Sequence, residues 1–163
     1  MTRERFRIVP LEYGLDRSTF CSGSEPLDRY LHEQVRQDIR RKVTACFTAI
    51  STDGSIAGYY TLASAGILLG ELPPEIIRRL PRYPSVPAVR MGRLAVHHEF
   101  QSIGLGGALL ADALRRVTQS EIAAFAMIVD AKDDKAAAFY RHHGFIETIS
   151  RPSVLFLPMA TVK

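Results

Sequence analysis

The stretch QSIGLGGALL, residues 101–110, places three glycines in four positions and then continues into leucines and alanines. A strand-like run, residues 88–96, precedes it, and a run with helical spacing, residues 107–117, follows it. A strand that passes through glycines into a helix leaves backbone N–H groups free at the helix N-terminus, where side chains would block an approaching ligand. The stretch predicts a seat for phosphate, although a turn that needs glycine explains the same letters.

The pattern Gln101-x-x-Gly104-x-Gly106 differs from two common phosphate-binding loops. No Gly-Lys-Ser/Thr follows it, as a Walker A loop requires, and no acidic residue ends a following strand at the distance typical of a dinucleotide site. The pattern alone is a weak signal, so its meaning depends on the rest of the chain.

Length and composition favour one compact domain spanning residues 1–163. The chain has 47% hydrophobic and 23% charged residues, without internal repeats or a linker rich in glycine and serine. No apolar run approaches the roughly 18 residues of a membrane-spanning helix, and the N-terminus lacks a signal-peptide pattern. We therefore expect a cytoplasmic protein with no membrane partner.

The cysteines and histidines show no metal-ligand spacing. Cys21 and Cys46 lie far apart, and the five histidines form no pattern with them. We expect two free thiols and no metal.

Local patterns predict the other elements. Apolar residues from Leu27 to Ile39 recur at helical spacing and indicate a helix of about 15 residues that starts near Ser24. Two β-rich runs around Asp53 and Gly54 predict an antiparallel hairpin. The remaining predictions are a short helix in residues 71–80, a connector in PRYPSVPAV (81–89), a strand in 88–96, a covered central strand in 122–131, a helix capped by Asp133 or Asp134 and stopped by Gly144, and closing strands in 145–150 and 153–158. The fold class is α/β (α+β).

Basic residues gather in two segments of a chain whose formal net charge is +4. Such runs are usually solvated surface, but clustered cations also bind polyanions by displacing counterions from phosphates. The candidates for nucleic-acid contact are Arg36, Arg40, Arg41, Lys42, Arg78, Arg79, Arg82, Arg90 and Arg93.

Two motifs together resemble the GCN5-related N-acetyltransferase (GNAT) superfamily. One is the QxxGxG loop after a strand, and the other is the later block AAFYRHHGF, which supplies Ala137, Phe139, Tyr140, Gly144 and Phe145. The resemblance implies the GNAT fold, a mixed and mostly antiparallel central sheet with splayed strands flanked by helices. It also implies acetyl-coenzyme A as cosubstrate. The residues implied to bind it are Leu94, Ala95, Val96, Gln101, Ser102, Ile103, Gly104, Leu105, Gly106, Gly107, Asp133 and Phe139. Many members carry Asn where this chain has Lys132, Asp133 and Asp134, so the pantetheine contact differs here.

Nearly the whole chain resembles one subgroup, the acetyltransferase toxins of type II toxin–antitoxin systems. The matching blocks are residues 20–41, 58–67, 81–87, 92–96 and 129–145. The resemblance implies an enzyme that acetylates the α-amine of aminoacyl-tRNA, blocks translation and pairs with a ribbon-helix-helix antitoxin. It also implies a homodimer.

Acetyl transfer from a thioester needs a neutral amine, a polarised carbonyl and a proton donor for the thiolate. The resemblance assigns the donor role to Tyr140, whose phenol suits a thiolate of similar basicity, although tyrosine in such a run also packs as a core residue. Backbone N–H groups near Leu94 to Val96 are the implied oxyanion hole.

No general base stands out, and His97, His98 and Glu99 are the candidates. Deprotonating a lysine near pH 7.4 would cost roughly 4 kcal/mol, whereas an α-amine with a pKa near 7.7 is already largely neutral. Two alternatives stay open beside the toxin: transfer to a small amine or a protein N-terminus, and a non-enzymatic sensor of acetyl-coenzyme A or DNA-binding partner.

Overall fold

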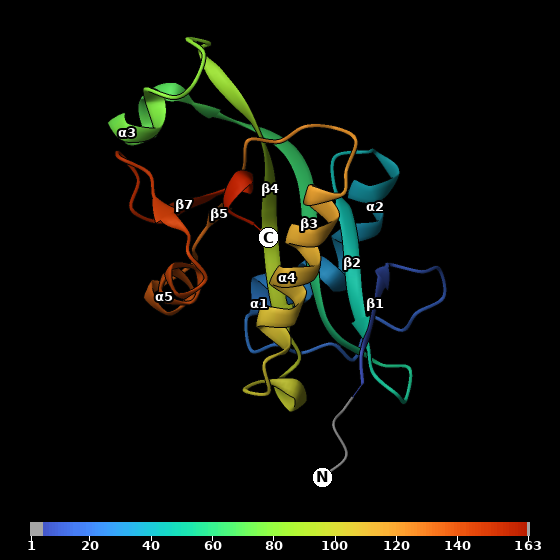
Figure 1. Ribbon diagram of the computed structural model, residues 1–163. Helices are drawn as coiled ribbons and strands as arrows, with labels where there is room; N and C mark the ends of the chain where they lie inside the picture. Colours follow the sequence, from blue (N-terminus) through green and yellow to red (C-terminus); the bar gives the residue numbers. More distant parts are fainter. Residues whose placement is uncertain (1–4, 163) are drawn as a thin grey trace. The chain divides into compact units, whose positions relative to one another are not determined.

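The computed structural model describes residues 5–162, which form a seven-stranded sheet with flanking helices (Figure 1). The elements are β1 (Arg7–Pro10), α1 (Glu25–Arg29), η1 (Tyr30–Gln34), α2 (Val35–Arg40), β2 (Ala45–Ile50), β3 (Ile56–Leu68), η2 (Leu69–Glu71), α3 (Pro74–Ile77), β4 (Ser85–Val96), η3 (His98–Phe100), α4 (Leu105–Thr118), β5 (Ala126–Asp130), α5 (Asp134–His142), β6 (Ile146–Glu147), β7 (Val154–Pro158) and η4 (Met159–Thr161).

The strand order is β1-β2-β3-β4-β5-β7-β6. The pairs β1–β2, β2–β3, β5–β7 and β6–β7 are antiparallel, and β4–β5 is parallel. The mixed, mostly antiparallel sheet expected from the sequence is confirmed. No helix within residues 5–162 is long and apolar enough to cross a membrane.

The chain divides into two compact units, and β3 and β4 each contribute residues to both. Unit 1 contains the described residues up to 63 together with 92–115, and unit 2 contains 64–91 with the described residues from 116 onward.

One hydrophobic cluster organises the first face of unit 1. The helical segment α1–η1–α2 contributes its apolar stripe, β2 and β3 contribute strand residues, and Ala95 comes from β4. The buried members are Phe20, Tyr30, Leu31, Val35, Cys46, Ile50, Ile56, Tyr59 and Ala95. The predicted helix of about 15 residues is thus confirmed, with its stripe facing the sheet.

The predicted helix contains a π-helical turn, which the spacing of its apolar residues did not indicate. At this turn the Val35 N–H donates to the carbonyl of Tyr30, five residues back. A π turn widens the helix and leaves room for an outside donor. Arg17 fills that role, because its Nη1 donates to the Leu31 carbonyl at 2.9 Å.

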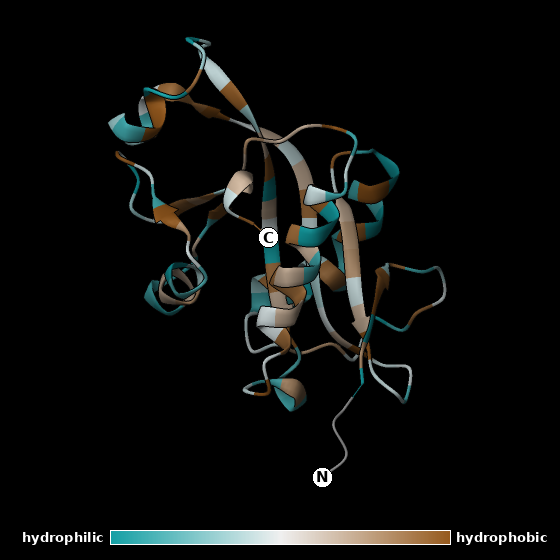
Figure 2. Ribbon diagram, viewed as in Figure 1, coloured by the Kyte–Doolittle hydropathy of each residue, from teal (hydrophilic) through white to brown (hydrophobic). Residues whose placement is uncertain are grey.

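Helix α4 covers the opposite face of the unit 1 strands (Figure 1). A Cβ on Gly58 would lie 2.9 Å from both the Ala95 carbonyl and a Leu109 methyl, so only glycine lets α4 approach this strand so closely. Figure 2 shows the helix banded with hydrophilic and hydrophobic residues, as expected when one side is buried.

Unit 2 is built around the parallel ladder between β4 and β5. The ladder joins Ala88–Met91 to residues 126–129, all four of which are buried, and ends there, as expected for strands that splay. Its core cluster consists of Ile67, Leu72, Val86, Ala88, Ala126, Ile128, Val154 and Phe156. Helix α3 is the predicted short helix, with proline in its first turn.

Three details differ from the sequence predictions. Ser85–Val89 is strand, not connector, because Val86 and Ala88 alternate inward while Pro87, which has no N–H to pair, offers its carbonyl to the Phe125 N–H at 2.8 Å. The strand β1 was not predicted, since four residues that include a charge and a proline give little β signal. The predicted strand at 145–150 shrinks to the two residues of β6.

Candidate functional site

In unit 1 the residues after β4 form the loop that the glycines indicated. Residues 101–104 are turns, with positive φ at Ser102 (66°) and Gly104 (88°), and α4 begins at Leu105. Leu105 is buried, which anchors the helix start, while Ile103 is 57% exposed. The tight reversal explains the need for glycine at 104, where a Cβ would be strained.

The loop offers unused backbone donors. Within residues 5–162, no backbone N–H from Gln101 to Gly107 donates to another group, and the first helical bond runs from Ala108 to the Gly104 carbonyl at 3.1 Å. The first turn of α4 carries no acidic side chain. Free N–H groups in the positive field of a helix N-terminus suit an anion, so these residues fit the pyrophosphate of a coenzyme A thioester.

Gln101 ties this loop to two neighbouring carbonyls. Its Nε2 donates to the Val96 carbonyl at 2.9 Å and to the Ser22 carbonyl at 2.8 Å. The adjacent His98 N–H donates to the Cys21 carbonyl at 2.8 Å. The segment before α1 is therefore fixed against the end of β4, and the Gln101 carboxamide holds the loop in place.

The three candidates for a general base lie in this same turn. The Nδ1 of His97 accepts the Glu99 backbone N–H at 3.1 Å, and its ring stacks on that of His98 with centroids 4.4 Å apart. His97 is half-buried, whereas His98 and Glu99 are exposed. His97 thus uses its Nδ1 as a local cap.

Leu94, Ala95 and Val96 form the last residues of β4. Ala95 is buried in the unit 1 core, and its two neighbours are half-buried. Close to them in unit 1, the hydroxyl of Thr61 is buried without a hydrogen-bond partner among the described residues, and a Cβ on Gly92 would lie 3.3 Å from it. An unpaired buried hydroxyl is uncommon in a folded core.

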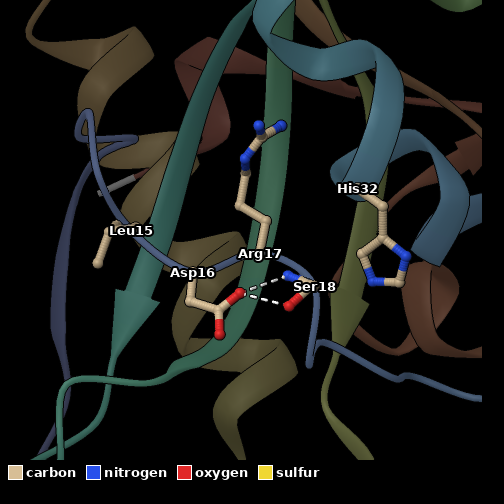
Figure 3. Close-up of a pocket in the computed structure, with 5 residues that line it drawn as sticks. All are labelled: Leu15, Asp16, Arg17, Ser18 and His32. Atoms are coloured by element: carbon tan, nitrogen blue, oxygen red, sulfur yellow. Dashed lines mark hydrogen bonds between the residues drawn. The ribbon is translucent and has the colours of Figure 1, made fainter.

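Two hollows border His32, and sequence reasoning did not find either. The first is lined by Leu15, Asp16, Arg17, Ser18 and His32 (Figure 3), and the second by Cys21, Gly23, Glu25, Asp28, Arg29, His32 and Glu33. Figure 3 shows the Arg17 side chain directed away from Asp16, whose carboxylate accepts both donors of Ser18. The His32 Nε2 lies 2.8 Å from the Phe20 carbonyl, which can only accept, so this nitrogen carries a proton.

Tyr140 lies in unit 2, on α5. Asp133 caps that helix by accepting the Ala136 N–H at 2.8 Å, and a Schellman turn ends it, with Phe145 N–H on the Tyr140 carbonyl at 3.1 Å and Gly144 at positive φ. The Asp133 carboxylate is thus already engaged by the helix. These two fixed ends hold α5 in place.

The Tyr140 ring is 7% exposed and contacts Phe139 and Phe145 edge to face or tilted. Its hydroxyl has no hydrogen-bond partner among residues 5–162. Burial raises the pKa of Tyr140 to about 12, so the phenol is fully protonated at neutral pH. It can therefore donate a proton.

The basic candidates share one property: none forms an ion pair with a carboxylate within residues 5–162. Two of them contact aromatic rings, with the guanidinium of Arg36 3.7 Å from the Tyr13 centroid and that of Arg93 3.5 Å from the Tyr30 centroid. Unit 1 carries Arg36, Arg40, Arg41, Lys42 and Arg93, and unit 2 carries Arg78, Arg79, Arg82 and Arg90. Sequence patterns give no signal for Tyr13 or Tyr30 as partners, because both pairs join residues distant in the chain.

A family model described as an acetyltransferase (GNAT) domain matches residues 22–162. The chain belongs to the GNAT acetyltransferases. A curated tRNA-acetylating toxin of Mycobacterium tuberculosis (strain ATCC 25618 / H37Rv) is 35% identical over 146 residues, which cover 88% of this GNAT chain and 86% of that protein.

Two solved structures share the fold of this GNAT chain. The structure of AtaT complexed with acetyl-methionyl-tRNAfMet superimposes with a TM-score of 0.90 at 26% identity, covering 97% of each chain. The structure of AtaTR bound with AcCoA gives a TM-score of 0.84 at 26% identity, covering 96% of this chain and 95% of that one. The GNAT fold expected from the sequence is confirmed, and the chain is an acetyltransferase by family.

Proposed function

We propose that this chain is the toxin of a type II toxin–antitoxin pair and transfers acetyl from acetyl-coenzyme A to the α-amine of aminoacyl-tRNA, which blocks translation. The observation that carries the proposal is the set of nine Arg and Lys side chains that make no ion pair within residues 5–162 of an acetyltransferase. Unpaired clustered cations are expected where phosphates bind. The tRNA-acetylating relative supports the same substrate.

The cosubstrate supplies an acetyl thioester, and the residues of this chain divide the remaining work. Backbone N–H groups from Gln101 to Gly107 hold its pyrophosphate, and those near Leu94 to Val96 polarise the thioester carbonyl. Asp133 and Phe139 contribute through α5, the first as its cap and the second by packing on Tyr140. These assignments rest on the family and on the unused donors of the loop.

Tyr140 acts as the general acid. The substrate nitrogen forms a bond to the acetyl carbon, the carbon–sulfur bond breaks, and the Tyr140 hydroxyl gives its proton to the departing thiolate. The amine proton leaves to water. The partner-free hydroxyl and the raised pKa of about 12 support this role, because the phenol is always protonated when the thiolate forms.

An α-amine needs no strong base, and the turn after β4 agrees with that. His97 uses Nδ1 as a cap, and His98 and Glu99 are exposed. A lysine substrate would require a placed carboxylate to offset roughly 4 kcal/mol near pH 7.4, whereas an α-amine near 7.7 is largely neutral. The acceptor class therefore fits a site without a dedicated base.

The proposal extends to assembly and location. A ribbon-helix-helix antitoxin neutralises the toxin, residues 1–163 act as one acetyltransferase domain, and the enzyme works as a homodimer in the cytoplasm, where charged tRNA is found. The toxin relative supports the antitoxin, and the family model that spans residues 22–162 supports the single domain.

The test is transfer of radiolabelled acetyl from acetyl-coenzyme A to tRNA, charged or deacylated. Wild type is compared with Tyr140→Phe, and Tyr83→Phe serves as a matched control because it removes the hydroxyl of an exposed tyrosine. We expect label on charged tRNA alone, released with the amino acid by mild base. Tyr140→Phe should reduce it by about 100-fold or more, the usual contribution of a general acid.

Label on small amines or protein N-termini but not on charged tRNA would overturn the substrate. In that case activity would be indifferent to salt and to RNase, as an acceptor without phosphates requires. Cofactor that binds and stays uncleaved with every acceptor would leave only the sensor alternative.

A further inference from the structure

Tyr13 is the large side chain that the fold of unit 1 leaves most conspicuously in water. It is 86% exposed, in the loop between β1 and α1, and Gly14 beside it has a φ of 88° that fixes a tight turn. Leu11 and Leu15 on either side turn inward and pack on the unit 1 core. The loop is therefore anchored by its leucines while it holds the tyrosine ring outward.

One face of this ring is already held. The guanidinium carbon of Arg36 lies 3.7 Å from the ring centroid, the distance of a cation–π contact. Arg36 is half-buried and has no carboxylate partner among residues 5–162. The arginine thus orients the ring, and the exposure of Tyr13 shows that the rest of the ring stays open to water.

The charge around the ring is positive. Glu12, the acidic neighbour of Tyr13, is paired with Arg7 at 3.6 Å. Arg36 and Arg40 stand four residues apart in α2 and so share a helix face. Polar residues adjoin the ring in the chain, so the site offers a flat aromatic surface with cations beside it and not an apolar groove.

We propose that Tyr13 and Arg36 form a stacking site for an unpaired nucleotide of RNA. The base stacks on the open face of the Tyr13 ring, while Arg36 and Arg40 neutralise the adjoining phosphates. Single-stranded RNA is commonly bound by aromatic faces combined with arginine, because every base has a π face. The inference rests on the proposed function, since it identifies where an unpaired part of the tRNA substrate would bind.

The absence of tryptophan from the chain allows a direct test. Tyr13→Trp introduces one fluorophore at the site, and Ile122→Trp places one at another exposed position, 82% accessible. The probes are a short single-stranded RNA and the blunt duplex of the same sequence. We expect single-stranded RNA to quench Tyr13→Trp strongly and duplex RNA to quench it little, with no quenching of Ile122→Trp.

Affinity for deacylated tRNA supplies the second readout. Tyr13→Ala should weaken binding about tenfold, the usual effect of losing one stacked base, and Tyr13→Phe should bind as wild type. Tyr13→Ala should leave the slope of log K against log salt unchanged because stacking is not ionic, whereas Arg40→Ala should reduce that slope by about one. A merely structural role for the ring would not separate these slopes.

Three outcomes would overturn the inference. They are equal tRNA affinity in Tyr13→Ala, quenching of Tyr13→Trp by duplex as strong as by single strand, and quenching by an antitoxin peptide but not by RNA. Acetylation of charged tRNA by wild type is measured in parallel. If acetylation proceeds while Tyr13→Ala binds normally, the stacking site fails and the proposed function stands, and if wild type neither binds nor acetylates tRNA, both fail.

Discussion

The guanidinium carbon of Arg93 lies 3.5 Å from the centroid of the Tyr30 ring, and the Tyr30 hydroxyl donates to Asp38 at 2.8 Å. The strand that ends in Leu94–Val96 is thereby fastened to the π-helical turn. Arg93 is half-buried in this arrangement.

The Arg93–Tyr30 contact predicts that Arg93 contributes to stability as well as to charge. Arg93→Ala should lower the free energy of unfolding by about 1–2 kcal/mol, because it removes a partly desolvated cation–π contact and the packing of the arginine stem. Urea denaturation of the variant beside Arg79→Ala, an exposed arginine, measures the difference. Unchanged stability with weakened tRNA binding would place Arg93 in the RNA contact instead.

Lys42 offers a clean separation of fold from function. It ends α2 in a Schellman turn at a φ of 62°, with Val43 N–H on the Asp38 carbonyl and its own N–H on the Ile39 carbonyl, both at 3.1 Å. Glycine is preferred there, so Lys42→Gly should stabilise the protein by about 1 kcal/mol.

If Lys42 contacts tRNA, the same substitution should weaken binding and reduce the salt slope by about one. Thermal melts and tRNA titrations at several salt concentrations measure the two effects. A more stable protein with unaltered tRNA affinity would remove Lys42 from the interface.

The exposed pair Arg78 and Arg79 tests the second basic segment. Reversing both charges to Glu should reduce activity on charged tRNA and flatten its salt dependence, since each lost phosphate contact removes about 0.9 from the slope. Stability should stay within about 0.5 kcal/mol, as expected for exposed residues. Arg151→Glu, also exposed, is the matched control. Activity equal to wild type at all salt concentrations would exclude these two arginines.

The sequence predicted elements whose signals are local. Asp133 as a cap and Gly144 as a stop depend on neighbours within four residues, so the bounds of α5 follow from the letters. The glycine loop before α4 is local in the same way. The π turn at Tyr30 and the contact of Arg36 with Tyr13 could not be predicted, because each depends on residues that only the fold brings together. The strand at Pro87 was missed since proline content outweighed the alternation of Val86 and Ala88.

Thr61 carries a buried hydroxyl that the described residues leave unpaired. Thr61→Val keeps the shape and removes the polar atom, so it should raise the free energy of unfolding by about 1 kcal/mol. Chemical denaturation and acetyl-transfer assays on the same preparation measure both consequences. A variant that gains stability and keeps full activity would show that the hydroxyl serves no substrate, whereas a variant that loses stability would show that the hydroxyl is satisfied in solution.

The raised pKa of Tyr140 links stability to alkaline pH. The unfolded phenol loses its proton near pH 10, whereas burial holds the folded group protonated up to about pH 12. Between these values the unfolded state binds fewer protons, so stability falls as pH rises, by about 1 kcal/mol at pH 11. Tyr140→Phe lacks this term, and the stability difference between wild type and the variant should shift by that amount from pH 9 to pH 11. A difference that stays constant over this range would mean that Tyr140 titrates normally and is solvated in the folded enzyme.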